Sequence, residues 1–206
     1  MHGHGRHSPP LHATDAYRLR MDTTSARDEP IRTTLKRQYH AGLSMLRTAV
    51  ERFPDDRWTD GVADNAFWQI AYHTLFYTHL YLHPGIDAFR PFAGHQGDVQ
   101  NTGALTGPAD PDSALPLLPD PYPKAHMLAF AEHLIATLDA SADALDLTAA
   151  ESGFPWYAMS KLEHQLVNLR HLQHHTGQLI ERLRMATGSG VEWVGSGSHR
   201  PSRPGG

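Results

Sequence analysis

The sequence contains no cysteine. This absence excludes disulfides, thiolate nucleophiles, cysteine-ligated zinc and iron–sulfur clusters, so any sulfur used in chemistry must come from another molecule. Concentrated charge is also lacking, because 18 lysines and arginines against 22 aspartates and glutamates leave a net charge of only −4. Since no basic block stands out, neither nucleic acid nor an anionic membrane is an expected partner.

Long hydrophobic runs are missing as well. No segment approaches the roughly 20 apolar residues that a membrane-spanning helix needs. The N-terminal stretch MHGHGRHSPPLHATDAYRLR lacks the apolar core of a signal peptide, so we expect a cytoplasmic protein. Met21 is a second candidate for the start of translation beside Met1, because MDTTSARDEP reads as an ordinary beginning.

Hydrophobic periodicity predicts four helices. The first covers residues 30–53, with a proline in its first turn and apolar residues at helical spacing. The second, over residues 62–83, is apolar nearly all round, which is typical of a central, buried helix. A third helix is expected over residues 123–145. The capping sequence SKLE opens a fourth helix over residues 161–187, and a glycine follows its end.

Residues 84–122 interrupt this pattern. Prolines and glycines are too dense there for a long helix or a central strand. We interpret the segment as a long crossover that joins two helices running in the same direction. With no convincing strand elsewhere, the sequence predicts an all-α protein, a four-helix bundle over residues 28–187. Residues 1–27 and 188–206 are expected to be disordered tails.

Histidine is the compositional outlier, at 16 residues. At about 100° per residue, His171 and His175 lie about 40° apart on one face of the fourth helix, whereas His174 lies about 60° off on the other side. The same stripe also holds His164, Asn168, Gln178 and Arg182. Two interpretations are open: this is the solvated face of an amphipathic helix, or His171 and His175 chelate a divalent metal through neutral imidazoles.

A histidine pair does not complete a metal site, so a third ligand must come from another element. His73 is the natural candidate, because an imidazole in the most apolar helix needs partners for both ring nitrogens. Its alternative role is a core histidine with one hydrogen bond. His79 and His83 are either alternative ligands or the exposed edge of the same helix. Gly177, in the middle of the fourth helix, indicates either close approach of a backbone or ligand, or mere tolerance.

Two stretches of the sequence, WQIAYHTLFYTHLYL and SKLEHQLVNLRHLQHHTGQLIERL, resemble the DinB/YfiT-like superfamily. The resemblance implies a four-helix bundle in up-down-down-up order, with a metal held by three histidines. Carried over residue by residue, it makes His73, His171 and His175 the ligands, and HTGQ matches the superfamily's H-x-G-Q. Three imidazoles with an open fourth position are typical of a catalytic zinc site, although nickel, iron or manganese would also bind.

The same resemblance implies a metal-dependent enzyme with a small-molecule substrate. Its reaction would be either hydrolysis, or transfer or isomerisation with a low-molecular-weight bacterial thiol such as mycothiol or bacillithiol. No carboxylate has a spacing that nominates it as a general base, which counts against hydrolysis. Candidate auxiliary groups are Gln178, His174, Tyr157, Trp156, His164 and Asn168. The alternative is a non-catalytic metal- or ligand-binding stress-response protein, or a homodimer built on the apolar side of the bundle.

Overall fold

A computed structural model describes residues 13–60, 65–97, 99–101 and 120–197 of the chain. Its four α-helices are α1 (Ala13–Arg52), α2 (Phe67–Tyr81), α3 (Lys124–Asp143) and α4 (Lys161–Thr187). Short 3₁₀ turns at Asp55–Arg57 and Ile86–Ala88 lie in the connections, and the described ranges contain no β-strand. The predicted all-α fold is confirmed.

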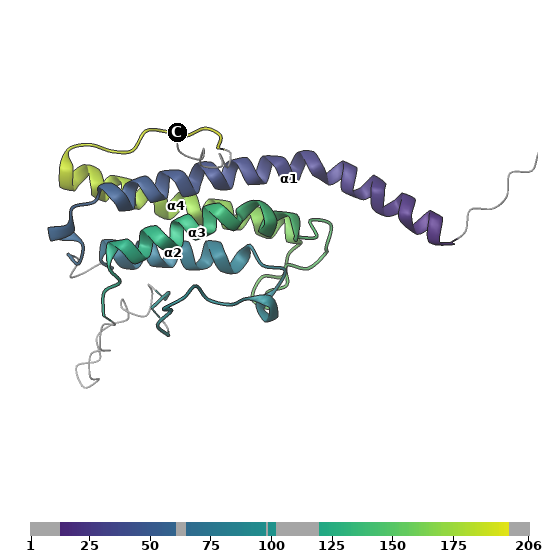
Figure 1. Cartoon of the computed structure of the whole chain (residues 1–206), viewed down its shortest axis with the longest axis horizontal. Helices are drawn as coiled ribbons and strands as arrows, with labels where there is room; N and C mark the ends of the chain where they lie inside the picture. The colour runs from purple at the N-terminus through teal and green to yellow at the C-terminus, as the bar shows by residue number, and fades with distance from the viewer. Residues whose placement is uncertain (1–12, 61–64, 98, 102–119, 198–206) are drawn as a thin grey trace, which may run out of the picture.

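The helices form a bundle in up-down-down-up order (Figure 1). α1 and α4 run in one direction and α2 and α3 in the other, so the chain between α2 and α3 returns along the bundle, as a long crossover. Each of α1 and α2 packs against both α3 and α4. α2 and α4 are therefore antiparallel neighbours, which places the middle of one helix beside the middle of the other.

α2 is the most deeply buried helix, as its all-round apolar pattern predicts. Every residue of α2 except His73 and Tyr77 is buried. Each large apolar side chain buried in this way contributes about 1.5–3 kcal/mol to the hydrophobic stabilisation of the fold. Within the described part of the chain, no helix combines the length and hydropathy needed to cross a membrane.

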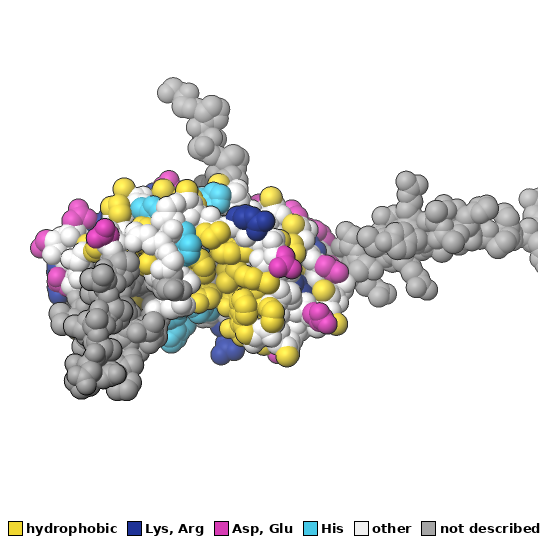
Figure 2. Space-filling model, turned by 90° about the horizontal axis from the view of Figure 1, so that it is seen from below, with side chains coloured by type: hydrophobic (Ala, Val, Ile, Leu, Met, Phe, Trp, Pro, Cys, Tyr) yellow, Lys and Arg dark blue, Asp and Glu magenta, His cyan; other side chains and the backbone are white. Residues whose placement is uncertain are grey.

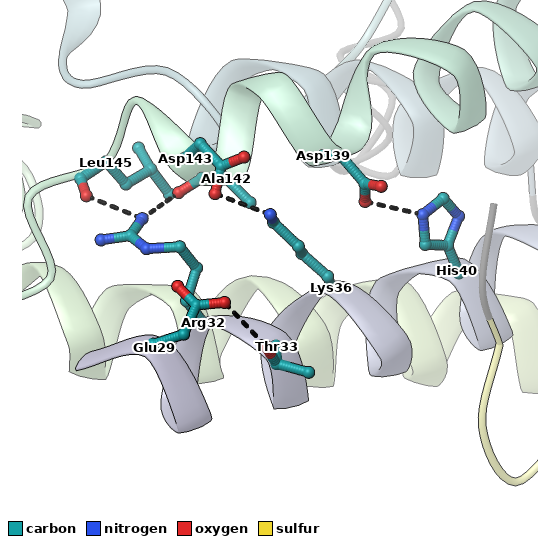
Figure 3. A network of polar contacts seen from close by, with 9 residues as sticks. All are labelled: Glu29, Arg32, Thr33, Lys36, His40, Asp139, Ala142, Asp143 and Leu145. Carbon is teal, nitrogen blue, oxygen red and sulfur yellow. Dashed lines mark hydrogen bonds and ion pairs between the residues drawn. The ribbon is translucent and has the colours of Figure 1, made fainter. Parts of the chain in front are cut away.

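α1 and α3 are joined by a ladder of polar contacts (Figure 3). Three α1 side chains, spaced one turn apart, reach across to the C-terminal end of α3. They pair Arg32 with the Leu145 carbonyl at 3.0 Å, Lys36 with Asp143 at 2.6 Å, and His40 with Asp139 at 2.9 Å. Because the Asp143 carboxylate is about half exposed, its ion pair with Lys36 contributes at most about 1 kcal/mol, and the ladder serves mainly to define the register of the two helices.

The first helix begins much earlier than predicted. α1 starts at Ala13 rather than at Pro30, within the stretch expected as a tail, while residues 1–12 lie outside the described part. Pro30 sits inside the helix, where it lacks the amide donor of one helical hydrogen bond. Pro30 is exposed, so its ring disturbs no core packing, and the N-terminal part of α1 projects beyond the bundle (Figure 1).

The C-terminal segment is also ordered where a disordered tail was expected. Residues 188–197 run back over α1 (Figure 1), and residues 198–206 lie outside the described part. The Gly197 amide donates to the Arg37 carbonyl at 3.0 Å, and the Gln38 side chain donates to the Gly195 carbonyl at 3.2 Å. Two valines of this segment pack against the hydrophobic core. This packing holds the segment in place although its sequence is rich in glycine and serine.

The ends of α2 and α4 are determined by local hydrogen bonds. α4 occupies residues 161–187 as predicted, with the Ser160 hydroxyl accepting the Glu163 amide at 3.2 Å and Gly188 in the left-handed region at φ 76°. α2 begins at Phe67 rather than at residue 62, because the Gln69 side chain turns back to accept the Ala66 amide at 2.6 Å. Such a bond satisfies an amide that the helix itself leaves unpaired.

The described part of the crossover is packed against α2 and α3. Phe92 stacks on Phe130 of α3 with ring centroids 4.5 Å apart. The Tyr72 hydroxyl lies 2.6 Å from His95 Nδ1, and this contact ties the crossover to α2. The consequence is that Gln100, far from α2 in sequence, arrives beside His73.

Candidate metal centre

Three histidines meet between α2 and α4. His73 comes from the middle of α2, and His171 and His175 come from one face of α4. One ring nitrogen of each lies within 4.8 Å of the corresponding atoms of the other two, and His73 Nε2 is 2.9 Å from His171 Nε2. The structure thus brings together the three residues expected as metal ligands, in a group that could hold a metal ion.

Hydrogen bonds at the outer ring nitrogens orient two of these imidazoles. His73 Nδ1 donates to the Gln100 carbonyl at 2.6 Å, and His175 Nδ1 is 2.7 Å from the Gln178 side-chain oxygen. Because a carbonyl oxygen only accepts, Nδ1 carries the proton in both rings, and each Nε2 keeps its lone pair. This arrangement of a ligating nitrogen supported by a bond at the opposite nitrogen is typical of metal-binding histidines.

Burial keeps the three imidazoles neutral. Loss of solvent lowers the pKa of His73 to about 4 and that of His171 to about 3, and it lowers the pKa of His175 as well. Neutral imidazole is the form that binds a metal. His73 Nε2 and His171 Nε2 lie 2.9 Å apart, so His171 can donate an N–H to the lone pair of His73, and a bound ion would replace that proton. The donor set therefore fits a divalent ion of the zinc type.

The three histidines open into a cavity of about 670 Å³. Besides the histidines and Gln100, the described lining residues are Leu80, Ile86 and six aromatic residues, Phe76, Tyr77, Tyr81, Phe89, Trp156 and Tyr157. None of these carries a charge. Figure 2 views the molecule from the side of the crossover and shows a hydrophobic area with histidine side chains beside it. Such a volume suits a small organic ligand.

The aromatic lining extends a stripe that begins at the metal centre. Tyr77 and Tyr81 follow His73 at intervals of four residues, so all three lie on one face of α2. This i, i+4 spacing is visible in the sequence itself. The Gln100 carbonyl and Phe89, by contrast, reach the site from the crossover. Nothing in the sequence around them indicates that they lie there.

The auxiliary candidates differ in where they lie relative to the cavity. Tyr157 and Trp156 line the cavity, and Gln178 lies on the outer side of His175, where it orients the ring. His174 is exposed and does not line the cavity, although its ring lies 4.9 Å from that of His175. His79 lies outside the three-histidine group, in ring contact with His83 and His133.

The polar stripe of α4 is buried rather than solvated at its N-terminal end. His164 and Asn168 have no exposed surface, which contradicts the solvated-face interpretation for these two residues. His164 lies behind the cavity wall, with its ring 4.6 Å from that of Tyr81 and 4.9 Å from that of Tyr157. The reason is the position of α2, whose polar atoms pair with this stripe: the Asn168 amide donates to the Thr78 carbonyl at 3.3 Å.

The chain matches no protein-family model, no curated protein and no solved structure. The arrangement of its own residues is therefore the basis for any functional conclusion.

The buried histidines outside the metal centre predict a loss of stability in acid. Burial lowers the pKa of His79 and of His164 to about 4. A histidine in the unfolded chain binds its proton near pH 6.5, so between about pH 6.5 and 4 only the unfolded state takes up these protons. The free energy of unfolding should therefore be highest above about pH 6.5 and fall in acid by up to about 1.4 kcal/mol per pH unit for each histidine.

Urea denaturation of the metal-free protein at several pH values measures this slope. His164→Gln should make the pH dependence shallower, whatever its effect on absolute stability. His174→Gln changes an exposed histidine of the same helix. The slope of its free energy of unfolding against pH should equal that of the unsubstituted protein. Equal slopes for all three proteins would contradict the assignment of His164 as a neutral buried group.

Proposed function

We propose that the protein is a metal-dependent enzyme that uses a low-molecular-weight thiol, as a transferase or an isomerase, in the manner implied by its resemblance to the DinB/YfiT-like superfamily. The observation that carries the proposal is a group of three neutral imidazoles opening into a cavity whose described lining is uncharged. A structural zinc site is closed by four protein ligands, whereas three ligands beside a cavity leave a position for substrate.

His73, His171 and His175 would hold the metal through Nε2. A divalent ion bound in this way supplies a Lewis acid that lowers the pKa of a thiol or water at its open position. The chain contributes rigidity to this centre, because the Gln100 carbonyl and the Gln178 side chain orient two of the rings before any ion binds.

The lining favours a thiol over water as the attacking group. Hydrolysis calls for a general base within hydrogen-bonding reach, and no aspartate or glutamate is among the described residues of the cavity. Three neutral ligands also leave the charge of a divalent ion uncompensated, which favours an anionic next ligand, either thiolate or hydroxide. Since the chain has no cysteine, that sulfur must belong to the substrate.

The loop before α4 closes one side of the cavity and limits access of water. The Trp156 indole donates to the Tyr81 hydroxyl at 3.3 Å, which holds the indole ring against α2. Tyr157 stands next to it, at the edge of the Tyr81 ring with centroids 5.6 Å apart. These two residues would position the second substrate rather than transfer protons.

Replacement of the metal by cobalt(II) tests this proposal directly. A thiol that binds the ion produces a sulfur-to-cobalt charge-transfer absorption, which a water or hydroxide ligand does not. We expect this absorption when the cobalt-loaded full-length protein is titrated with low-molecular-weight thiols, and none with His171→Ala. Hydrolytic turnover without the absorption would refute the thiol proposal, and thiol binding without turnover of any electrophile would favour a non-catalytic binding protein.

A further inference from the structure

The part of the cavity beyond the histidines is built from aromatic rings that three separate segments contribute. α2 provides Phe76, Tyr77 and Tyr81, the crossover provides Phe89, and the loop before α4 provides Trp156 and Tyr157. The Phe76 and Phe89 rings meet edge to face with centroids 5.4 Å apart, and the Tyr81 and Tyr157 rings meet at 81°. Rings set at right angles present both faces and edges to the space between them, which suits another planar aromatic group.

Trp156 stands out because it is aromatic, lines the cavity and is 54% exposed. Its indole nitrogen is engaged with the Tyr81 hydroxyl, so the exposed surface of the ring is apolar. A large apolar side chain left open at the mouth of a cavity marks a place where a ligand completes the packing.

The charges around the cavity restrict the ligand further. Aromatic faces alone would also attract a cation. A divalent ion on the three histidines repels a cation, however, and no carboxylate in the described lining offsets that repulsion. No lysine or arginine in the same lining would pair with an anionic group away from the metal. An ionic group buried there without a partner would be strongly unfavourable.

We infer that the cavity binds the body of a substrate that is uncharged, planar and aromatic, beside the thiol at the metal. This inference rests on the proposed function for the position of the thiol and deepens it by naming the class of the second substrate. Trp156 and Tyr157 are the residues that determine specificity, and the phenol hydroxyls of Tyr81 and Tyr157 can pair with a single polar substituent on the ring.

A matched pair of fluorescent probes tests the ligand class without using activity. N-phenyl-1-naphthylamine is uncharged, and 8-anilinonaphthalene-1-sulfonate is the same ring system with one sulfonate. The metal-free full-length protein should bind the uncharged probe roughly tenfold more tightly than the sulfonate. Displacement of the bound probe should need less 1-naphthol than decahydro-1-naphthol, which has the same skeleton without aromatic rings.

Two exposed tryptophans provide matched variants. Trp156→Ala should weaken binding of the uncharged probe roughly fivefold, whereas Trp193→Ala, which removes a tryptophan 73% exposed and outside the cavity, should change it by less than about twofold. Because both side chains are exposed, neither change should prevent folding, and circular dichroism of the variants verifies this. Equal effects of the two changes, or equal binding of the two probes, would overturn the inference.

Failure of this inference can be distinguished from failure of the proposed function. Probe binding by metal-free protein needs neither the ion nor the thiol. If cobalt-loaded protein shows no thiol absorption but the probe data hold, the proposed function fails and the aromatic ligand class stands. If the thiol absorption appears and the probe data fail, the proposed function stands and the inferred substrate class is wrong.

Discussion

His171→Ala should weaken zinc binding roughly 100- to 1,000-fold, since the free energy of a zinc–protein complex is shared among only a few ligands. His171 Nε2 lies 2.9 Å from His73 Nε2, and the His171 ring lies 4.6 Å from that of His175. Removal of this imidazole leaves two ligands on opposite helices, which do not retain zinc against a chelator. Competition with a chromophoric chelator measures the affinity.

His174→Ala is the matched control. This histidine lies on the same helix, is exposed and touches the His175 ring without lining the cavity, so its removal takes away no ligand and should leave zinc affinity unchanged within about twofold. Gln178→Ala should lie between the two, with a loss of roughly tenfold, because it removes the hydrogen bond that orients His175. Equal zinc affinity of the His171→Ala and His174→Ala proteins would refute the metal centre.

Histidines near the ends of the chain call for care in this measurement. His2, His4, His7, His12 and His199 lie outside the described residues and can bind metal weakly by themselves. Their contribution is common to every variant, so differences between variants isolate the site. Purification without an affinity tag or nickel resin avoids loading these residues.

Gly153→Ala should destabilise the protein by about 3 kcal/mol or more. Gly153 has φ +82°, and a Cβ added to it would lie 2.2 Å from the Pro84 carbonyl oxygen. Both the left-handed backbone and the contact with rigid backbone atoms oppose any side chain. Its own carbonyl accepts the Ile86 amide at 3.2 Å, so the substitution would also separate the crossover from the loop that carries Trp156.

Gly177→Ala is expected to stabilise the protein, the opposite of the effect of Gly153→Ala. Gly177 lies in the interior of α4, and a Cβ there would meet no described atom within 4 Å. The sequence left open a close approach of another backbone at this position, and none exists among the described residues. Alanine should therefore stabilise the helix by about 0.5–1 kcal/mol, through its higher helix propensity. Urea denaturation of both variants tests the contrast, and a stable Gly153→Ala protein would contradict the described loop geometry.

Several features could be predicted from local sequence because their causes are local. The SKLE capping sequence and Gly188 predicted the ends of α4 correctly, since both act through the backbone within one turn. The spacing of His171 and His175 placed them on one helix face for the same reason. The apolar composition of α2 predicted its burial.

Other features depend on segments that are distant in sequence. Pro30 was expected to begin α1, but it lies exposed inside a longer helix, where the one lost hydrogen bond disturbs no core packing. The C-terminal segment follows α1 because its valines find the core and Gly197 fits against the α1 backbone, where an added Cβ would be 2.7 Å from the Ala41 amide nitrogen. Neither outcome can be read from composition alone.

The sequence by itself determined the fold class, the helix order and the pairing of His171 with His175 on one face, because helical periodicity and i, i+4 spacing are properties of a single segment. His73 was a candidate through its place in the most apolar helix and through the family resemblance. Only the tertiary structure decided that His73 meets His171, because that contact depends on the antiparallel packing of α2 and α4. It also decided the character of the cavity. The crossover and the loop before α4 bring Phe89, Gln100 and Trp156 together across long sequence separations, and only packing in three dimensions places them around one site.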